Sequence, residues 1–202
     1  MNLSIIIPFH NEEEDAEAVI GEVLELHPDA EIVAVDDGST DNTPAVLSQI
    51  RGIKVITLPQ CIGQSGALYR GLMEARGDIL VLMDGDGQSS TPDIERLLKY
   101  IPEYDFVNGL RAGRRDSLAR RLSSGFANSI RSRFLGDGMR DTGGSPKIMK
   151  KICVDHLVAV DGMHRFIPAM LAAAGFRSIE VPVQHRERRH GTTKYTNFQR
   201  GA

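Results

Sequence analysis

The stretch Ile79-Leu80-Val81-Leu82-Met83-Asp84-Gly85-Asp86-Gly87-Gln88 predicts a buried β-strand that ends in two carboxylates. Its apolar run, bounded by turn-forming residues, is typical of a short strand. Asp84 and Asp86 are two residues apart, so their side chains project to the same side, and the glycines allow a ligand close to the backbone. Such a pair attracts Mg²⁺ or Mn²⁺, which keeps positions open for substrate phosphates. Because ligands gather beyond the carboxyl ends of strands in open α/β sheets, we expect a metal and diphosphate site.

The Asp-x-Asp pattern alone is compatible with other interpretations. Asp and Gly are also ordinary turn formers after a strand. A calcium-binding loop from Asp84 to Glu95 is rejected, because its sixth position is Ser89 instead of Gly and its flank is strand-like. A phosphatase that uses the first Asp as a nucleophile stays open on this motif, and only the rest of the chain can weaken it.

Length and composition favour one substantial domain, since 202 residues with 41% hydrophobic content can bury a real core. Cys61 and Cys153 lie far apart without metal-ligand spacing, which disfavours a disulfide framework or a zinc site and favours a reducing compartment. No apolar run has the length that spans a bilayer, and the N-terminus begins directly on a strand pattern without a secretory signal. We therefore expect a soluble, cytoplasmic chain.

Charge is distributed unevenly along the sequence. Residues 1–50 contain twelve Asp or Glu and no Lys or Arg, so all 24 basic residues fall in 51–202. Seven arginines lie between residues 111 and 133, where Asp116 is the only acid. This asymmetry indicates a phosphate-bearing partner, which could be a substrate, a nucleic acid or an anionic membrane surface. An RNA-binding module is disfavoured because only 5% of residues are aromatic and there is no Trp.

The alternation of strand and helix patterns predicts an α/β fold, a mostly parallel sheet wrapped by helices. Strands are expected at residues 3–8, 32–35, 53–58, 79–83, 106–109 and 179–183, and residues 147–154 are expected to resume as strand and helix. Asn11 is expected to cap the first helix. No Gly-x-Gly-x-x-Gly follows the first strand, which excludes a dinucleotide fingerprint but leaves a mononucleotide possible. His164, near a helix start, is interpreted as a capping or packing residue. The basic loop 185–194 is interpreted as a flexible clamp for phosphate oxygens.

Five segments resemble, in order, motifs of the family 2 inverting glycosyltransferases, specifically the polyprenyl- or dolichyl-phosphate mannose synthase type. The resemblance covers Ile5 to about Lys194. The segments are Pro8-Phe9-His10-Asn11-Glu12, Val35-Asp36-Asp37-Gly38-Ser39-Thr40-Asp41, Met83-Asp84-Gly85-Asp86-Gly87-Gln88, Gly109-Leu110-Arg111 and Arg188-Arg189-His190-Gly191-Thr192-Thr193-Lys194. The chain departs from the pattern twice: His10 replaces the usual Tyr, and Gly143-Gly144-Ser145 stands where Gly-Phe or Gly-Cys is more common.

The resemblance implies a GT-A (Rossmann-like) fold, a nucleoside-diphosphate sugar donor such as GDP-mannose or a UDP-sugar, and Mg²⁺ or Mn²⁺. It implies a single domain over 1–202, with a nucleotide-sugar-binding half at 1–109 and a smaller acceptor-binding half at 110–202. Metal ligands would be Asp84, Asp86 and Gln88, and a phosphate clamp would be formed by Arg188 and Lys194. The remaining donor contacts would be Pro8, His10, Glu12, Val35, Asp37, Met83, Gly85, Gln88 and Arg111.

Charge then predicts the mechanism. The departing nucleoside diphosphate gains negative charge, which a metal held by Asp84 and Asp86 stabilises. A polyprenyl phosphate acceptor, undecaprenyl or dolichyl, is already an anion and needs no strong base, whereas a sugar hydroxyl, the alternative acceptor, needs one, and Asp141 is the candidate. The arginines at 111–133 fit a lipid phosphate and an anionic membrane better than a neutral sugar. We expect an enzyme peripheral to the cytoplasmic face of the membrane, or a chain cut before further membrane helices.

Other enzyme and non-enzyme classes fit less well. A sugar-nucleotide pyrophosphorylase would carry a Gly-rich phosphate loop after the first strand, and residues 8–12 do not form one. The phosphatase would carry its Asp-x-Asp motif early in the chain and needs no base pocket. A catalytically inactive scaffold would not need the intact Asp84, Asp86, Arg188 and Lys194.

Overall fold

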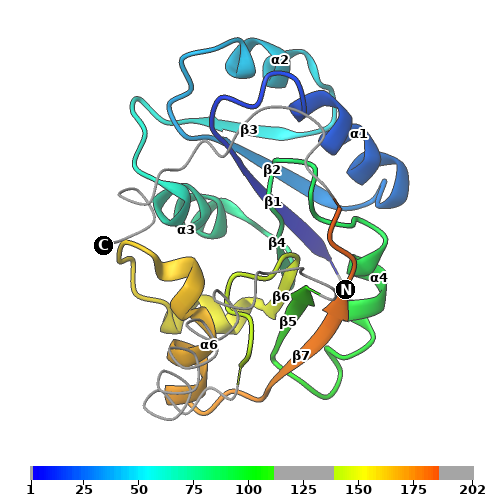
Figure 1. Cartoon of the computed structure of the whole chain (residues 1–202), viewed down its shortest axis with the longest axis vertical. Coiled ribbons are helices and arrows are strands. Elements are labelled where there is room, and N and C mark those ends of the chain that lie inside the picture. Colours follow the sequence, from blue (N-terminus) through cyan, green and yellow to red (C-terminus); the bar gives the residue numbers. More distant parts are fainter. Residues whose placement is uncertain (1, 112–138, 187–202) are drawn as a thin grey trace, which may run out of the picture.

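A seven-stranded sheet with helices on both faces forms the core of the molecule (Figure 1). The computed structural model describes residues 2–111 and 139–186. The arginines of the 112–138 segment and the clamp residues Arg188 and Lys194 lie outside the described residues.

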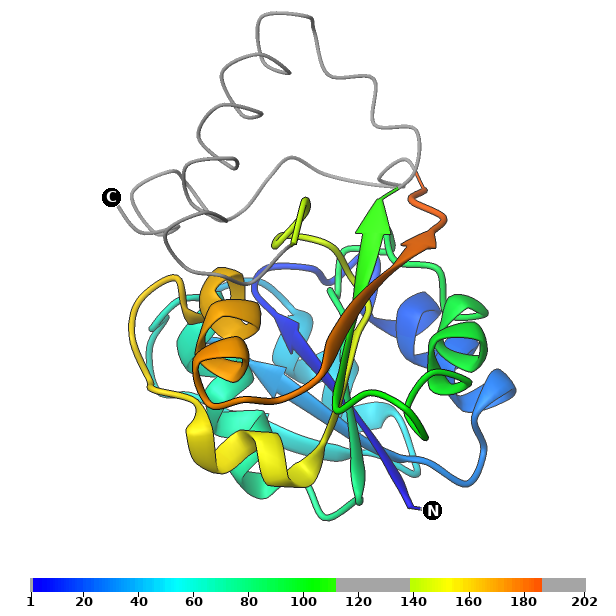
Figure 2. The ribbon, with the colours of Figure 1, turned by 90° about the horizontal axis from the view of Figure 1, so that it is seen from below.

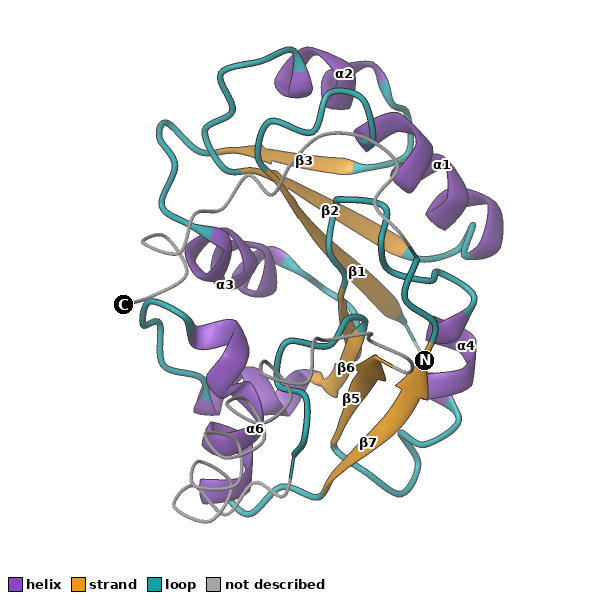
Figure 3. Cartoon of the chain, viewed as in Figure 1, coloured by secondary structure: helices purple, strands orange, loops and turns teal. Residues whose placement is uncertain are grey.

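The described elements follow the expected alternation (Figure 3). The strands are β1 (Leu3–Phe9), β2 (Glu31–Asp36), β3 (Lys54–Thr57), β4 (Ile79–Leu82), β5 (Phe106–Arg111), β6 (Lys147–Lys150) and β7 (Ser178–Val183). The helices are α1 (Ala16–Leu26), α2 (Thr43–Gln49), α3 (Gln64–Glu74), α4 (Asp93–Leu98), α6 (Met163–Ala173) and the 3₁₀-helix η1 (Lys151–His156).

The sheet has the order β3-β2-β1-β4-β6-β5-β7. Strand β6 runs antiparallel to both of its neighbours, and all other pairs are parallel. The predicted α/β class with a mostly parallel sheet is confirmed, although the alternation of patterns gave no indication that β6 would be inserted in the opposite direction. Because β6 and β7 pair with β4 and β5, one continuous sheet crosses the expected division near residue 109.

Two apolar layers sandwich the sheet. On one face, β1, β2 and β4 pack against α1, α2 and α4, and on the other the same strands pack against α3, η1 and α6. Figure 2 shows α1 and α4 on one side of the sheet and α6 on the other. Strand β4 illustrates the alternation: Ile79 and Val81 enter the first layer and Leu80 and Leu82 the second. Both layers hold β4 rigidly, so the carboxylates after it start from a fixed point.

Asn11 is not the cap of the first helix, which corrects the sequence-based expectation. It has a positive φ of 54°, and its side-chain oxygen accepts hydrogen bonds from the backbone N–H groups of Thr40 (2.7 Å) and Asp41 (3.3 Å). Helix α1 begins only at Ala16, with Asp15 at the N-cap position. The amide therefore joins the loop after β1 to the loop after β2, a contact between distant residues that competes with local capping.

Cys61 and Cys153 are both free thiols. Among the described residues, none of the helices has the length and apolar character needed to cross a bilayer.

Candidate functional site

The predicted site residues converge on one edge of the sheet. Strands β1, β2, β4 and β5 all end there, and antiparallel β6 begins there. The loops that follow β1, β2 and β4 carry His10, Asp37 and Asp84. The end of β5 brings Arg111, and the start of β6 brings Lys147. Parallel topology thus gathers groups from across the sequence at the place where open α/β sheets bind ligands.

Asp37 organises the part of the edge beyond β1 and β2. Its carboxylate is buried and accepts hydrogen bonds from the backbone N–H of Ile62 (2.8 Å) and from the Cys61 thiol (3.3 Å). Nδ1 of His10 lies 2.7 Å from the Asp37 carbonyl oxygen. Because a carbonyl oxygen only accepts, this contact assigns the proton to Nδ1. The ligating atoms of His10, Asp37 and Cys61 lie within 4.8 Å of one another, which forms a compact polar group.

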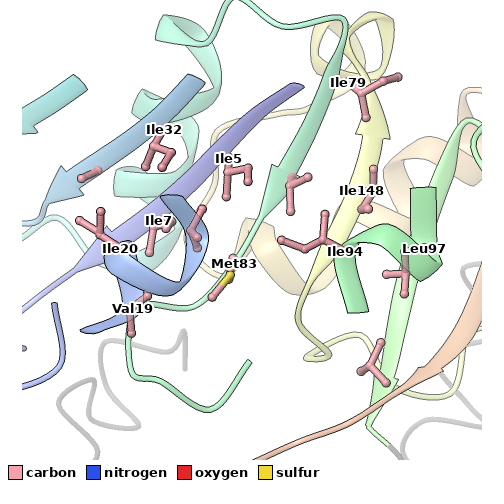
Figure 4. Packing of buried hydrophobic residues seen from close by; sticks show 14 of the residues in the cluster. Ile5, Ile7, Val19, Ile20, Ile32, Ile79, Met83, Ile94, Leu97 and Ile148 are labelled. Atoms are coloured by element: carbon pink, nitrogen blue, oxygen red, sulfur yellow. The ribbon is translucent and has the colours of Figure 1, made fainter. Parts of the chain in front are cut away.

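The other predicted donor contacts differ in what they can present to a ligand. The side chains of Val35 and Met83 are buried in the two apolar layers, as Figure 4 shows for Met83, so any contact with a ligand would have to use their backbone. Glu12 is also buried, and its backbone N–H donates to Oγ1 of Thr43 (2.9 Å).

Gly85 lets the loop after β4 approach the end of β1. A Cβ atom at this position would lie 2.6 Å from the carbonyl oxygen of Pro8 and 2.7 Å from the Phe9 ring. A side chain would therefore push the two strand ends apart, which explains why the residue between Asp84 and Asp86 is a glycine.

Asp84 is held on several sides. Its Oδ1 accepts a hydrogen bond from Nε2 of Gln64 (2.8 Å), and its backbone N–H donates to Oγ of Ser145 (3.1 Å). Burial raises the pKa of Asp84 to about 6, and the negative charge of Asp86 acts in the same direction, while Lys147 and Arg111 oppose them. The ionised form of the Asp84 carboxylate is thus disfavoured unless further positive charge binds nearby.

These residues fit a hard divalent cation. Two carboxylates from one short loop offer oxygen ligands, and a cation between them would relieve the repulsion that raises the pKa of Asp84. The oxygen donors match Mg²⁺ or Mn²⁺ better than a soft metal.

Gln88, the third predicted metal ligand, is joined to the chain after β7. Its carbonyl oxygen accepts from the backbone N–H of Arg186 (2.9 Å), and its Nε2 donates to the carbonyl of Arg186 (3.4 Å). The guanidinium of Arg186 forms a bidentate pair with Glu22 of α1 at 2.7 and 2.8 Å. Arg186, which lies in the predicted clamp loop 185–194, is therefore anchored both to the carboxylate loop and to α1.

Asp141, the candidate base, forms a bidentate ion pair with Arg111 at 2.7 and 2.8 Å. Burial acts to raise the pKa of Asp141, but the hydrogen bonds and charge of Arg111, with the charge of Lys147, outweigh it and hold the pKa below its usual value. Glu180 of β7 fixes the backbone here by accepting from the N–H groups of Arg140 and Asp141, each at 2.9 Å. A carboxylate held in this way is a weak proton acceptor near neutral pH.

Lys147 is a site residue that sequence reasoning missed. It is only 5% exposed, and its ammonium donates to the carbonyl of Gly144. Burial lowers the pKa of Lys147 to about 8, although the carboxylates of Asp84 and Asp141 act to raise it. No local signal marks this lysine, because in the sequence it begins an ordinary strand. The only hint is its position at the start of an expected strand, six residues after the candidate acid Asp141.

Two further polar residues connect the site to its supporting helices. Gln64, the first residue of α3, donates to Asp84, and the adjacent Ser65 has its Oγ 2.8 Å from Nδ1 of His164 on α6. His164 thus lies at the junction of two helices, and its ring binds a buried hydroxyl. Ser65 and His164 are 99 residues apart in the sequence, so no local pattern could have paired them.

Comparisons with known proteins agree with this geometry. The sequence model of the family described as "Glycosyl transferase family 2" matches residues 4–157. A protein of Pectobacterium carotovorum subsp. carotovorum (strain PC1), named undecaprenyl-phosphate 4-deoxy-4-formamido-L-arabinose transferase, is 33% identical over 205 residues, which cover 96% of this chain and 63% of the relative. A protein of the same name from Proteus mirabilis (strain HI4320) is 31% identical with the same coverage. The chain therefore spans somewhat less than two thirds of the length of these relatives.

Solved structures resemble the fold. Glucosyl-3-phosphoglycerate synthase from Mycobacterium tuberculosis superposes with a TM-score of 0.74 and 21% sequence identity, over 95% of this chain and 73% of that chain. A second structure of the same synthase gives a TM-score of 0.75 at 21% identity, again over 95% of this chain and 73% of that one.

Proposed function

The chain belongs to glycosyl transferase family 2, and we propose that it transfers a sugar, with inversion and with the help of a divalent cation, from a nucleoside-diphosphate sugar to a polyprenyl phosphate. The observation that carries this proposal is the pairing of Asp141 with Arg111 beside the Asp84–Asp86 loop. It leaves the site with a place for a metal and a diphosphate but with a poor proton acceptor.

An acceptor that arrives as an anion fits this arrangement. A hydroxyl must lose a proton during attack, and the carboxylate of Asp141 has a lowered pKa because Arg111 holds it. A lipid phosphate needs no such step. The names of the relatives support the same acceptor class, since both name undecaprenyl phosphate. Transfer to a sugar hydroxyl remains the alternative and would require another base.

The donor and metal rest on the chemistry of the residues and on the fold. The synthase with the same fold was solved with Mn²⁺ and UDP-glucose, and also with Mg²⁺ and UDP, and this supports a divalent cation and a UDP-sugar here. The sugar stays open: the expected mannose synthase type implies mannose, whereas the relatives name a formamido-arabinose.

The roles of the residues follow from their places at the sheet edge. Asp84 and Asp86, with Gln88, would hold the cation. His10 and Asp37 would face the base or ribose, with Pro8, Glu12, Val35, Met83 and Gly85 shaping the donor site through backbone or packing. Arg111 would turn its positive charge toward phosphates while it stays paired with Asp141. Arg188 and Lys194 would add the clamp.

Catalysis would depend on charge placed in advance. The bound cation would supply positive charge to the leaving diphosphate. The chain's own residues fix the geometry: Gln64 and Ser145 orient Asp84, Glu180 orients the Asp141 backbone, and Arg111 keeps a guanidinium at the end of β5. The acceptor side would meet a membrane surface, and we place the enzyme on the cytoplasmic face, where lipid phosphate and nucleotide sugar meet.

A transfer assay tests the proposal. The chain is incubated with a short-chain polyprenyl phosphate and with labelled UDP-sugars and GDP-mannose in parallel, with Mn²⁺, Mg²⁺ or EDTA. We expect label in the lipid fraction only when a metal is present, and the donor that gives it identifies the sugar. Label that appears only on soluble sugar acceptors would refute the lipid phosphate. If the chain is inactive alone, the same assay on a chain extended to the relatives' length decides the question.

A further inference from the structure

Lys147 is a buried cation at a position where packing alone does not require a charge. It is the first residue of β6, opposite Leu82 of β4 and Asn108 of β5, so it sits in the middle of the sheet at its functional edge. Only 5% of it is exposed, and its ammonium donates to the carbonyl of Gly144. Burying an ammonium group costs free energy unless opposite charges surround it.

Those opposite charges are the carboxylates of the site. Asp84 and Asp141 are the two groups whose charges favour the ammonium form of Lys147. Asp141 already has its own cation, because Arg111 binds both of its oxygens. Among the described residues, Asp84 has no bidentate cation of this kind: it forms hydrogen bonds with Gln64 and Ser145, and both partners are neutral. Of the two described cations that act on Asp84, Lys147 has a larger effect than Arg111, and Arg111 is already bound to Asp141.

We propose that Lys147 is a built-in counter-cation of the Asp84–Asp86 loop, which stabilises the loop when no metal is bound and opposes the binding of a divalent cation. The proposal rests on the proposed function only in taking Asp84 and Asp86 as metal ligands. It makes Lys147 a positioning residue whose charge sets how strongly the site holds metal before a diphosphate arrives.

The direction in which metal affinity changes when Lys147 is replaced distinguishes this role from ordinary structural support. Replacing Lys147 by an uncharged residue removes a positive charge close to the metal position, so the metal should bind more tightly. At the effective dielectric constant of protein sites, one unit charge several ångströms away changes the binding constant of a divalent ion by about tenfold or more. A lysine that only filled space or held the loop in shape would give unchanged or weaker binding when removed.

The chain offers a matched control on the same strand. Lys150, at the other end of β6, pairs with Asp105 at 2.8 Å with its side chain 34% exposed. It lies at the opposite edge of the sheet, so Lys150→Met removes a lysine and an ion pair without changing the charge at the Asp84–Asp86 loop. Lys147→Met keeps length and apolar volume but removes the charge. Lys147→Gln keeps a donor for the Gly144 carbonyl.

The experiment measures Mn²⁺ binding by calorimetry on the purified chain at pH 7, where Lys147 is mostly charged, with neither donor nor acceptor present, and thermal unfolding in EDTA. We expect Lys147→Met and Lys147→Gln to bind Mn²⁺ at least about tenfold more tightly than the wild type, and to melt several degrees lower in EDTA, with recovery when Mn²⁺ is added. Lys150→Met should bind Mn²⁺ within about twofold of the wild type. Asp86→Ala should abolish this binding and so confirm its location.

Unchanged or weaker Mn²⁺ binding by both Lys147 variants overturns the proposal. If the variants fold poorly, Mn²⁺ present during expression and purification should rescue them, because the cation replaces the missing charge, and failure of this rescue also overturns the proposal. Since no sugar is used, the result is separate from the transfer reaction. Tighter metal binding by the variants together with no transfer to polyprenyl phosphate would refute the proposed acceptor and leave the role of Lys147 intact.

Discussion

The two ends of the functional edge treat their acidic residues in opposite ways. After β4, burial and, second, the negative charge of Asp86 raise the pKa of Asp84 to about 6. Beside β5, Asp141 is paired with Arg111 and its pKa is lowered. Asp84 is bonded to the neutral side chains of Gln64 and Ser145 and suits an added cation, whereas a carboxylate neutralised by arginine makes the neighbouring surface suitable for anions. One edge of the sheet therefore offers a place for a metal beside a place for phosphates.

Removing a carboxylate from the metal end should have the largest effect. Asp86→Ala is expected to lower the rate of sugar transfer by about 10³-fold or more, because it removes a ligand for the cation that stabilises the leaving group. The side chain lies in a loop outside the apolar layers, so the melting temperature in EDTA should be nearly unchanged. Transfer assays and thermal melts measure both.

Asp155→Ala is the matched control for that substitution. Asp155 is an exposed acid on η1, away from the edge, and its loss should leave transfer and stability as they are. If Asp86→Ala kept wild-type turnover with the ordinary metal dependence, the Asp84–Asp86 loop would not be the metal site. The two ends of the edge would then not differ in the way described.

The sequence alone predicts the acidic Asp84–Asp86 loop after β4, but it does not predict the pairing of Asp141 with Arg111 beside β5. Asp84 and Asp86 follow an unmistakable apolar strand, so their chemistry is visible in ten consecutive residues, and the strands at residues 3–8, 32–35 and 106–109 were placed correctly within a residue or two. The other end depends on contacts over 30 residues or more, such as Arg111 with Asp141, and on the antiparallel insertion of β6. Nothing in the local pattern of residues 147–150 gives that direction, so Lys147 could not be placed.

Removing Arg111 from its ion pair with Asp141, here called the neutralised end of the edge, should lower stability as well as activity. Arg111→Met leaves the carboxylate of Asp141 partly buried without its bidentate partner, and loss of such a partner costs about 2–4 kcal/mol at this exposure. The pKa of Asp141 should rise toward its usual value or above, because burial is then less opposed. Urea unfolding measures the first effect and the pH dependence of stability the second.

Arg111→Lys serves as the comparison, since it keeps the charge but cannot form the planar bidentate pair. It should recover part of the stability and little of the transfer. Equal stability of the wild type and Arg111→Met would show that Asp141 does not depend on the arginine, and the two ends would then not differ in the way described.

Two glycines test how tightly the neutralised end is packed. A Cβ at Gly144 would lie 1.6 Å from the carbonyl oxygen of Gly109, so Gly144→Ala must shift the loop between Asp141 and Lys147, at a cost of about 2–3 kcal/mol. Gly21→Ala in α1 is the control, because nothing lies within 4 Å of its Cβ position, and alanine should stabilise that helix by up to about 1 kcal/mol. Chemical unfolding of the two variants should therefore give opposite signs.

The pH dependence of the unfolding free energy should also distinguish the two ends of the functional edge. A folded-state pKa raised from 3.8 to about 6 means that the folded, metal-free protein binds the Asp84 proton more tightly than the unfolded chain does. Ionising Asp84 therefore destabilises the fold as pH rises through this window, by up to about 3 kcal/mol, and the loss persists above it. Asp84→Asn resembles the protonated form and should lack this decrease, so the difference in unfolding free energy between wild type and variant should change between pH 4 and pH 7 in EDTA. Saturating Mn²⁺ should reduce the decrease in the wild type alone, because the cation stabilises the ionised carboxylate.

For Asp141 the sign is reversed: its lowered pKa stabilises the fold at neutral pH, and that contribution is lost as the solution becomes acidic. A wild-type curve in EDTA that ran parallel to that of Asp84→Asn would show that the carboxylate is not strained, and the metal end would then have no electrostatic reason to prefer a cation.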